Sequence, residues 1–316
     1  MAEGGAESAM AEFLEQKLDE SYDAADVARI RAGWEAAATR PVTLRANSLK
    51  ADAGEVAAGL ADAGIAFERV AWYADAFVLR GVRERAVWDL PLYEEGKVYL
   101  QSLSSMLPPL ALRPQAGADI LDMCAAPGGK TSQIAALTGG AAHITACEMK
   151  APRADKLQHN LEKLGAGKVN VMRTDARRLD DFFRFDQVLV DASCTGSGTL
   201  RGADDPNAAR ITEALLAKTT RSQAALLDRA LSLLKPGGSL VYSTCSVLPQ
   251  ENGEQVRRAL SKHPDCRIDP LEKIGGMQVA DAPFGRLPGG PEGTICICPD
   301  ELYEGFYLAR IVKGGK

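Results

Sequence analysis

The 316-residue sequence lacks three features, and each absence excludes a class of protein. No run of about 20 apolar residues occurs, so we expect no membrane-spanning helix and no membrane partner. The opening MAEGGAESAMAEF lacks the basic start and apolar run of a secretory signal. The seven cysteines are odd in number and none precedes Cys124, unlike the dense framework of a disulfide-bonded secreted domain. We therefore expect free thiols in a cytoplasmic protein.

Aromatic residues are scarce at 6%, but 46% of the residues are hydrophobic and 25% are charged, which excludes wholesale disorder. The net charge of -5 is unevenly distributed. Residues 1–30 carry eight acidic and two basic side chains, whereas the other 286 residues carry 34 acidic and 35 basic ones. A near-neutral body can bear a local basic patch, so the net charge does not exclude a nucleic-acid partner.

The first 95 residues predict two small units. Residues 1–40 are rich in alanine and contain no proline, which favours a helical segment. Residues 41–95 have a β-α-β-β pattern, in which Asp52 and Glu55 form the capping box of a helix that ends at Gly64. We predict a small α+β RNA-binding domain of the RRM-like kind, although its arginines also fit a solvated charged face. These arginines are Arg45, Arg69, Arg80, Arg83 and Arg85.

Residues 96–316 alternate short apolar strands with helical patterns, which predicts a mostly parallel sheet with helices on both faces. The end of the chain, TICICPDELYEGFYLARIVK, predicts two strands joined by a turn, an antiparallel pair that closes the sheet at one edge. Ligands of such sheets bind beyond the carboxyl ends of the strands. The expected parallel strands are residues 119–124, 143–148, 169–174, 187–192 and 239–245.

The loop CAAPGGKTS, residues 124–132, follows the first of these strands and has a shape suited to a nucleotide-like ligand. Its two glycines let the backbone approach a ligand, and the next helix offers free N–H groups. A plain tight turn is the simpler alternative. A P-loop is a second, because Gly129, Lys130 and Thr131 match its tail, but Cys124 stands where a P-loop has glycine.

Polar residues also follow the other strands. Glu148 is placed to accept hydrogen bonds from ribose hydroxyls, and Asp175 either binds an adenine amine or caps a helix. Cys194 and Cys245 end strands that we expect to be neighbours, in loops rich in glycine, serine and threonine. A buried cysteine is often only a small hydrophobe. A nucleophilic thiolate here would need stabilisation, for example by Lys130 or a helix N-terminus.

Taken together, DMCAAPGGKTSQIA, CEMK, TDARRL, DASCTGSGT and YSTCSVLPQENGEQV resemble the RsmB/NOP/Sun family of RNA cytosine-5 methyltransferases. The resemblance extends to most of the chain beyond residue 40. It implies a class I methyltransferase domain, Rossmann-like with a seven-stranded sheet, over residues 96–316, with S-adenosylmethionine as cofactor. The residues that it implies for cofactor binding are Cys124, Ala125, Ala126, Pro127, Gly128, Gly129, Lys130, Glu148, Asp175 and Asp191.

The resemblance further implies that Cys245 is the nucleophile and that Cys194 assists release of the product. Attack of a thiolate on carbon 6 of cytosine activates carbon 5 for methylation, and covalent catalysis thus divides one hard step. Asp191 would hydrogen-bond the base near nitrogen 3, and Lys130 would hold Asp191 or the base. We favour rRNA over tRNA as the substrate, and we expect the target base to be unstacked.

Two segments depart from the family pattern. Ser193 replaces the usual proline before Cys194, and residues 201–210 differ from the usual basic stretch. Spacing alone does not say which thiol attacks, because DNA cytosine-5 enzymes place their nucleophile in the loop where Cys194 stands. A non-catalytic RNA-binding or ribosome-assembly factor on the same fold, and a P-loop NTPase, remain alternatives.

We predict no metal site and a monomeric protein. His263, Cys266, Cys296 and Cys298 lack the paired spacing of a structural zinc site. Cys296 and Cys298 are two apart in an expected strand, so we expect them on one face and in the core.

Overall fold

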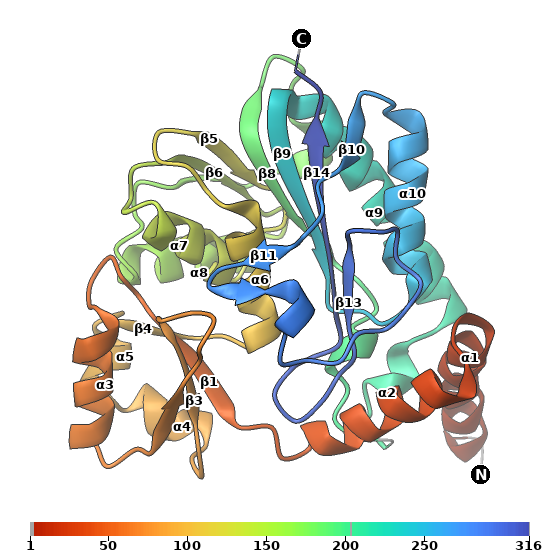
Figure 1. Ribbon diagram of the computed structural model, residues 1–316, viewed down its shortest axis with the longest axis horizontal. Helices are drawn as coiled ribbons and strands as arrows, with labels where there is room; N and C mark the ends of the chain where they lie inside the picture. Colours follow the sequence, from red (N-terminus) through yellow and green to blue (C-terminus); the bar gives the residue numbers. More distant parts are fainter. Residues whose placement is uncertain (1–2, 203, 316) are drawn as a thin grey trace.

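Figure 1 shows a computed structural model of the protein, which describes residues 3–202 and 204–315. A large sheet flanked by helices lies in the upper part of this view. A small antiparallel sheet with its own helices lies below it at the left, and two N-terminal helices lie at the lower right. No helix of the described residues is long and apolar enough to cross a membrane.

The N-terminal segment is helical, as predicted, but it breaks once. Helix α1 spans Glu3–Ser21 and α2 spans Ala24–Ala37. The break coincides with Asp23, whose side chain accepts the N–H of Asp26 and so begins α2. The apolar face of α2 is buried against the large domain, and Trp34 donates its indole N–H to Ser197 O at 3.0 Å.

The small sheet has four antiparallel strands in the order β2-β3-β1-β4. Its fourth strand lies beyond residue 95, so the predicted domain boundary cuts through the unit. The predicted cap is confirmed, since Asp52 accepts the N–H groups of Gly54 and Glu55. The elements are β1 Val42–Ala46, α3 Ala53–Asp62, β2 Phe67–Arg69, β3 Ala76–Leu79, α4 Glu84–Trp88, α5 Pro91–Glu94 and β4 Val98–Leu100.

Arg45 is an exception to the predicted arginine-bearing face, because the other four arginines, Arg69, Arg80, Arg83 and Arg85, are exposed. Its side chain is fully buried and donates to Gln101 Oε1 at 3.1 Å and to Ser132 Oγ at 3.0 Å. Arg45 therefore joins the small sheet to the large domain. Arg80 is exposed and pairs with Glu68.

The large sheet follows the order β10-β14-β9-β8-β5-β6-β7, a path of seven strands, and β13 also pairs with β14. The strands from β7 to β9 are parallel. The C-terminal strands are antiparallel, as predicted, but β14 lies inside the sheet between β9 and β10. The strands are β5 Asp119–Asp122, β6 His143–Cys147, β7 Asn170–Met172, β8 Phe185–Asp191, β9 Leu234–Thr244, β10 Cys266–Ile268, β13 Ile295–Ile297 and β14 Phe306–Lys313, with a separate hairpin of β11 Lys273–Ile274 and β12 Met277–Gln278.

Helices cover both faces of this sheet. Along β8, Val188 and Val190 belong to one hydrophobic cluster and Leu189 to the other, as the two-residue period of a strand requires. One face carries α9 and α10 together with the N-terminal helices, and the other carries α6, α7 and α8. The helices are α6 Leu103–Leu112, α7 Gly129–Leu137, α8 Ala151–Lys163, α9 Glu213–Leu233 and α10 Gly253–Lys262.

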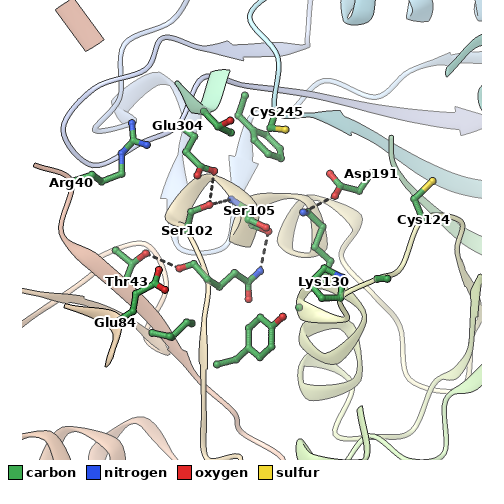
Figure 2. A pocket seen from close by; sticks show the side chains of 18 of the residues that line it. Arg40, Thr43, Glu84, Ser102, Ser105, Cys124, Lys130, Asp191, Cys245 and Glu304 are labelled. Carbon is green, nitrogen blue, oxygen red and sulfur yellow. Dashed lines mark hydrogen bonds and ion pairs between the residues drawn. The ribbon is translucent and has the colours of Figure 1, made fainter. Parts of the chain in front are cut away.

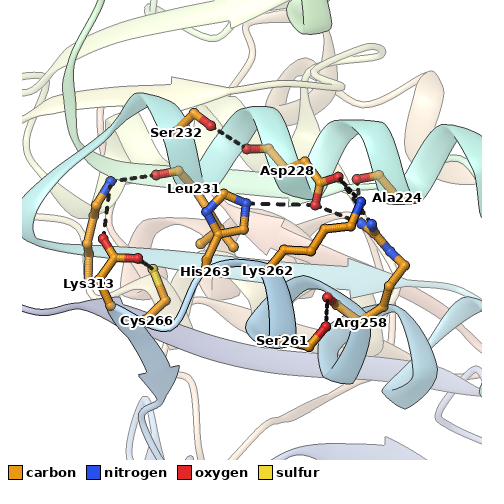
Figure 3. Close-up of polar contacts among 11 residues, drawn as sticks. Ala224, Asp228, Leu231, Ser232, Arg258, Ser261, Lys262, His263, Cys266 and Lys313 are labelled. Atoms are coloured by element: carbon orange, nitrogen blue, oxygen red, sulfur yellow. Dashed lines mark hydrogen bonds and ion pairs between the residues drawn. The ribbon is translucent and has the colours of Figure 1, made fainter.

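A polar cluster joins α9 to α10 (Figure 3). Asp228 of α9 accepts from Arg258 at 2.9 Å and from Lys262 at 3.3 Å, and His263 Nε2 lies 3.8 Å from the same carboxylate. His263 thus lies beside a structural ion-pair network, and the described residues contain no group of three or more metal-ligating side chains. Cys296 and Cys298 are buried in the core, as predicted.

Candidate active site

A cavity of about 390 Å³ opens between the small sheet and the carboxyl edge of the large sheet (Figure 2). Thr43, Tyr99 and Gln101 line it from the side of the small sheet. The opposite wall consists of the loops that follow β5, β8 and β9. The predicted residues in this wall are Cys124, Ala125, Ala126, Pro127, Gly129, Lys130, Asp191 and Cys245.

The loop after β5 turns sharply into α7, and Gly128 makes the turn possible. Its φ of 110° lies in the region that side chains with a Cβ avoid. Gly128 does not itself line the cavity, but Gly129 does, and a Cβ on Gly129 would lie 2.7 Å from the ring of Tyr99. The glycine pair therefore lets the loop pass close to the small sheet.

Asp122, at the end of β5, is a cavity residue that the sequence did not single out. It is 1% exposed, and Thr131 Oγ1 donates to its carboxylate at 2.7 Å. Burial raises the pKa of Asp122 to about 6. The available signal was an acid closing an otherwise apolar strand, DILD, at the ligand edge of the sheet.

Lys130 and Asp191 form an ion pair in the wall of this cavity, with Nζ and Oδ2 2.7 Å apart. Ser243 Oγ donates to the other oxygen of Asp191 at 2.7 Å. Burial by itself lowers the pKa of Lys130, but the charge of Asp191 and the hydrogen bond to it raise this pKa overall. Lys130 is therefore an ammonium group held beside a carboxylate, next to Cys245.

The two candidate thiols meet at the ends of neighbouring strands. Asp191 of β8 lies opposite Ser243 of β9, so the residues that follow each strand come together. Cys194 Sγ and Cys245 Sγ are 3.2 Å apart, within hydrogen-bond distance. The hydrogen bond to Cys245, together with burial, raises the pKa of Cys194 well above its ordinary value. Cys194 therefore keeps its proton beside Cys245.

Cys194 lines a second cavity of about 310 Å³, which Cys124 separates from the first. Glu148, 7% exposed, accepts the N–H of Lys150 at 2.9 Å and contacts Arg153 Nε at 3.2 Å. Asp175 also lines this cavity, and hydrogen bonds from Arg177 lower its pKa. It caps the 3-10 turn Ala176–Arg178 through the N–H of Arg177, which is one of its two expected roles, and binding of an adenine amine stays a prediction.

Two uncertain points of the sequence have a structural answer. The P-loop-like residues are committed to protein carboxylates, since Lys130 pairs with Asp191 and Thr131 donates to Asp122. Ser193 replaces the proline of the family pattern. A residue of α9 fixes its loop, because Gln223 Nε2 donates to Ser193 O at 3.1 Å. In the divergent segment, Arg201 is exposed and lines the first cavity.

The fold, with its parallel strands and ligand cavities at their carboxyl edge, defines a class I methyltransferase architecture. The pattern of the 16S rRNA methyltransferase RsmB/F family matches residues 109–312. The chain belongs to this family, as the sequence resemblance indicated. The cofactor of this family of methyltransferases is S-adenosylmethionine.

Three similar proteins illustrate the relationship. The ribosomal RNA small subunit methyltransferase F of Shewanella sp. (strain MR-7) is 33% identical over 289 residues, which cover 88% of this chain and 58% of that protein. The chain thus spans about three fifths of that relative. The crystal structure of a methyltransferase homolog protein from Pyrococcus horikoshii has a TM-score of 0.75 and 30% identity, covering 96% of this chain and 99% of that one. NSun6 from P. horikoshii, solved with SFG, has a TM-score of 0.80 at 22% identity over 96% of this chain and 98% of that one, a likeness of fold.

Proposed function

We propose that the protein is an S-adenosylmethionine-dependent RNA methyltransferase that forms 5-methylcytosine in small-subunit ribosomal RNA. The observation that carries the proposal is the pair of thiols, 3.2 Å apart, beside the Lys130–Asp191 ion pair at the ligand edge of the sheet. A fold that only bound RNA would need neither the thiol contact nor a buried ammonium group next to it. Membership of the family supports RNA as the substrate.

The second cavity fits the cofactor by its chemistry. Glu148 and Asp175 offer carboxylate oxygens, which suit the hydroxyls of a ribose and the amine of an adenine. Met123, Met149 and Leu226 supply apolar surface for a ring. When bound, S-adenosylmethionine supplies an electrophilic methyl group on a sulfonium centre. Cys124 lines both cavities, and it and the residues that follow it up to Lys130 would hold the remainder of the molecule.

The first cavity would receive the target base, because Cys245 lines it together with Lys130 and Asp191. The Cys245 thiolate attacks carbon 6 of the cytosine, a carbon–sulfur bond forms, and carbon 5 becomes an enamine carbon able to accept a methyl group. The Asp191 carboxylate accepts a hydrogen bond from the exocyclic amine of the cytosine, beside nitrogen 3. The Lys130 ammonium offsets the negative charge that develops there. Attack on the ring requires an unstacked base, so loops and ends of RNA are the favoured targets.

Release then requires removal of the proton from carbon 5, which expels Cys245 as a thiolate. Cys194 is the group placed to accept this proton, since its sulfur is 3.2 Å from that of Cys245. When Cys245 has become a thioether, it no longer carries the charge that helps to raise the pKa of Cys194. The thiolate form of Cys194, which is the base that the step needs, becomes easier to reach. The geometry favours Cys245 over Cys194 as the nucleophile, because Cys245 and not Cys194 lines the first cavity.

The test is methyl transfer from S-adenosylmethionine to unmodified small-subunit rRNA transcribed in vitro, with unmodified tRNA as the comparison. We expect 5-methylcytosine in the rRNA, identified by nucleoside mass spectrometry and located by bisulfite sequencing. Bisulfite sequencing of total RNA from cells with and without the gene then identifies the position in vivo. Tight binding of rRNA without any methylated nucleoside would favour the non-catalytic assembly factor instead.

A further inference from the structure

The two thiol loops are held by two consecutive residues, Glu251 and Asn252, which immediately follow the Cys245 loop. Both side chains are buried, 0% and 2% exposed, and neither lines the first or the second cavity. Neither is therefore placed to touch the base or the cofactor. Each of them is hydrogen-bonded, directly or through Gln223, to the two residues that flank one cysteine.

Glu251 holds the loop of Cys194. The N–H and the hydroxyl of Thr195 donate to its carboxylate at 2.9 Å and 2.6 Å. Gln223 Nε2 donates to the same carboxylate at 3.1 Å and also to Ser193 O at 3.1 Å. Both neighbours of Cys194 are thus fixed, one directly and one through Gln223. Among the described residues no basic side chain forms an ion pair with Glu251, so neutral donors alone stabilise this buried carboxylate.

Asn252 holds the loop of Cys245 in the same way. Its Oδ1 accepts the hydroxyl of Thr244, and its Nδ2 donates to Ser246 O at 2.8 Å. These are the two neighbours of Cys245. The loops are also joined to each other, since Gly198 N–H donates to Cys245 O at 3.0 Å. One dipeptide therefore sets the position of both sulfur atoms relative to each other.

We infer that Glu251 and Asn252 are positioning residues that set the Cys194–Cys245 geometry, with Asn252 serving the attacking thiol and Glu251 the releasing thiol. The inference rests on the proposed function for its catalytic consequence, but the thiol geometry can be measured without it. The division follows from the contacts, because each side chain bonds to the neighbours of a different cysteine. Glu251→Gln replaces one accepting oxygen by an N–H group, which then faces the donors of Thr195 and Gln223. Asn252→Asp removes the donor to Ser246 O.

The first experiment measures thiol geometry alone. Diamide removes two hydrogen atoms from a pair of close thiols, an S–S bond forms, and the diamide is reduced to its hydrazine. Peptide mass spectrometry follows the Cys194–Cys245 disulfide. We expect Glu251→Gln and Asn252→Asp each to slow its formation about tenfold, because displacement of a reacting group by an ångström has effects of this order or larger. Gln250→Ala, on the same turn but without a contact to either loop, is the matched control and keeps the wild-type rate.

The second experiment separates the two thiols by their roles, with unmodified small-subunit rRNA and labelled S-adenosylmethionine under single-turnover conditions. Asn252→Asp lowers the rate of methyl transfer about tenfold without accumulation of a protein–RNA adduct, and the KM for RNA stays unchanged. Glu251→Gln accumulates the adduct, because attack continues while release slows. Thr195→Val and Thr244→Val remove one bond of each set, and they reproduce the two patterns if a buried variant fails to fold.

The outcomes are distinct. If folded Glu251→Gln and Asn252→Asp match Gln250→Ala in both disulfide rate and turnover, the positioning role is wrong. If both variants lower turnover without any change in disulfide rate or adduct level, a general structural role replaces the division proposed here. If the wild-type protein methylates no RNA while the disulfide rates differ as expected, the proposed function fails and the inference on geometry stands.

Discussion

Two lysine–aspartate ion pairs lie at opposite edges of the large sheet and have nearly the same length. Lys130 and Asp191 are 2.7 Å apart at the carboxyl edge, with side chains 15% and 27% exposed. Lys235 and Asp119 are 2.8 Å apart at the amino edge, with side chains 33% and 47% exposed. Identical chemistry therefore occurs twice, and only the surroundings differ.

The surroundings decide what each pair can do. Lys235 also contacts Asp186 at 2.9 Å, so it joins the starts of the three parallel strands β5, β8 and β9 at an exposed position. Screening by water limits such a pair to a small structural effect. Lys130 and Asp191 line a cavity with a thiol, where electrostatic interactions act over a lower dielectric. The comparison indicates that burial beside Cys245, rather than the ion pair as such, marks the active edge.

The largest effect is expected from the thiols. Cys245→Ala should abolish methylation of unmodified small-subunit rRNA, because burial raises the pKa of Cys124, the other thiol that lines the first cavity, and so keeps it protonated. Cys266→Ala, which removes a thiol at the start of β10 at the amino edge, is the control and keeps its activity. Normal product from the Cys245 variant in a filter-binding assay of labelled methyl groups would refute its role.

One aspartate from each edge, Asp191 beside Lys130 and Asp186 beside Lys235, comes next. Asp191→Asn should lower kcat about 100-fold, since it weakens the hydrogen bond to the cytosine amine and no longer holds the Lys130 ammonium that offsets the developing negative charge. Asp186→Asn at the amino edge should change kcat by less than about twofold. Steady-state kinetics of both variants give the two values of kcat. A similar fall in kcat for both variants would contradict the distinction between the two edges.

The two ends of β5 should differ in how they make the free energy of unfolding depend on pH. The native pKa of Asp122 is about 6 and the reference value is 3.8, so the folded protein binds the extra proton between these values. The free energy of unfolding therefore falls by about 3 kcal/mol as pH rises through this window. Asp122→Asn lacks this fall, so its stability relative to wild type rises with pH.

The check is urea denaturation of wild type and Asp122→Asn at several pH values across this window. Asp119→Asn, which removes the exposed carboxylate at the other end of the same strand, is the matched control. A stability difference between Asp122→Asn and wild type that stays constant with pH would contradict the buried, protonated state.

The smallest effect is expected from Lys235→Ala. The exposed pair contributes less than about 1 kcal/mol to the free energy of unfolding, and methylation should be unchanged. Thermal denaturation and the labelled-methyl assay check both statements. A loss of activity in the folded variant would mean that the amino edge also serves the reaction.

Much of the fold could be predicted from the sequence because its strands are short apolar runs bounded by turn residues. Strand β8 and the loop with Cys194 show this, since periodicity and position placed both correctly. The sequence also predicted that Cys194 and Cys245 lie close together, because both follow strands expected to be adjacent. The contact of 3.2 Å between their sulfur atoms depends on side chains that only the structure reveals.

Residues that distant contacts bury were missed. Arg45 alternates with apolar neighbours in β1 as an exposed residue would, but Gln101 and Ser132, far along the chain, cover it. Glu251 lies in a polar stretch, PQENGEQ, that reads as surface. It is buried because Thr195 and Gln223 converge on it. No local pattern contains such partners.

The most direct test of the account is the covalent intermediate of Cys194→Ala. This variant keeps the attacking thiol and loses the proton acceptor, so a protein–RNA adduct should accumulate on incubation with unmodified small-subunit rRNA and S-adenosylmethionine. Denaturing electrophoresis detects the adduct, and mass spectrometry of the digested adduct locates the modified residue. We predict a methylated cytidine attached to the sulfur of Cys245. Attachment to any other residue, or full turnover without an adduct, would contradict the account.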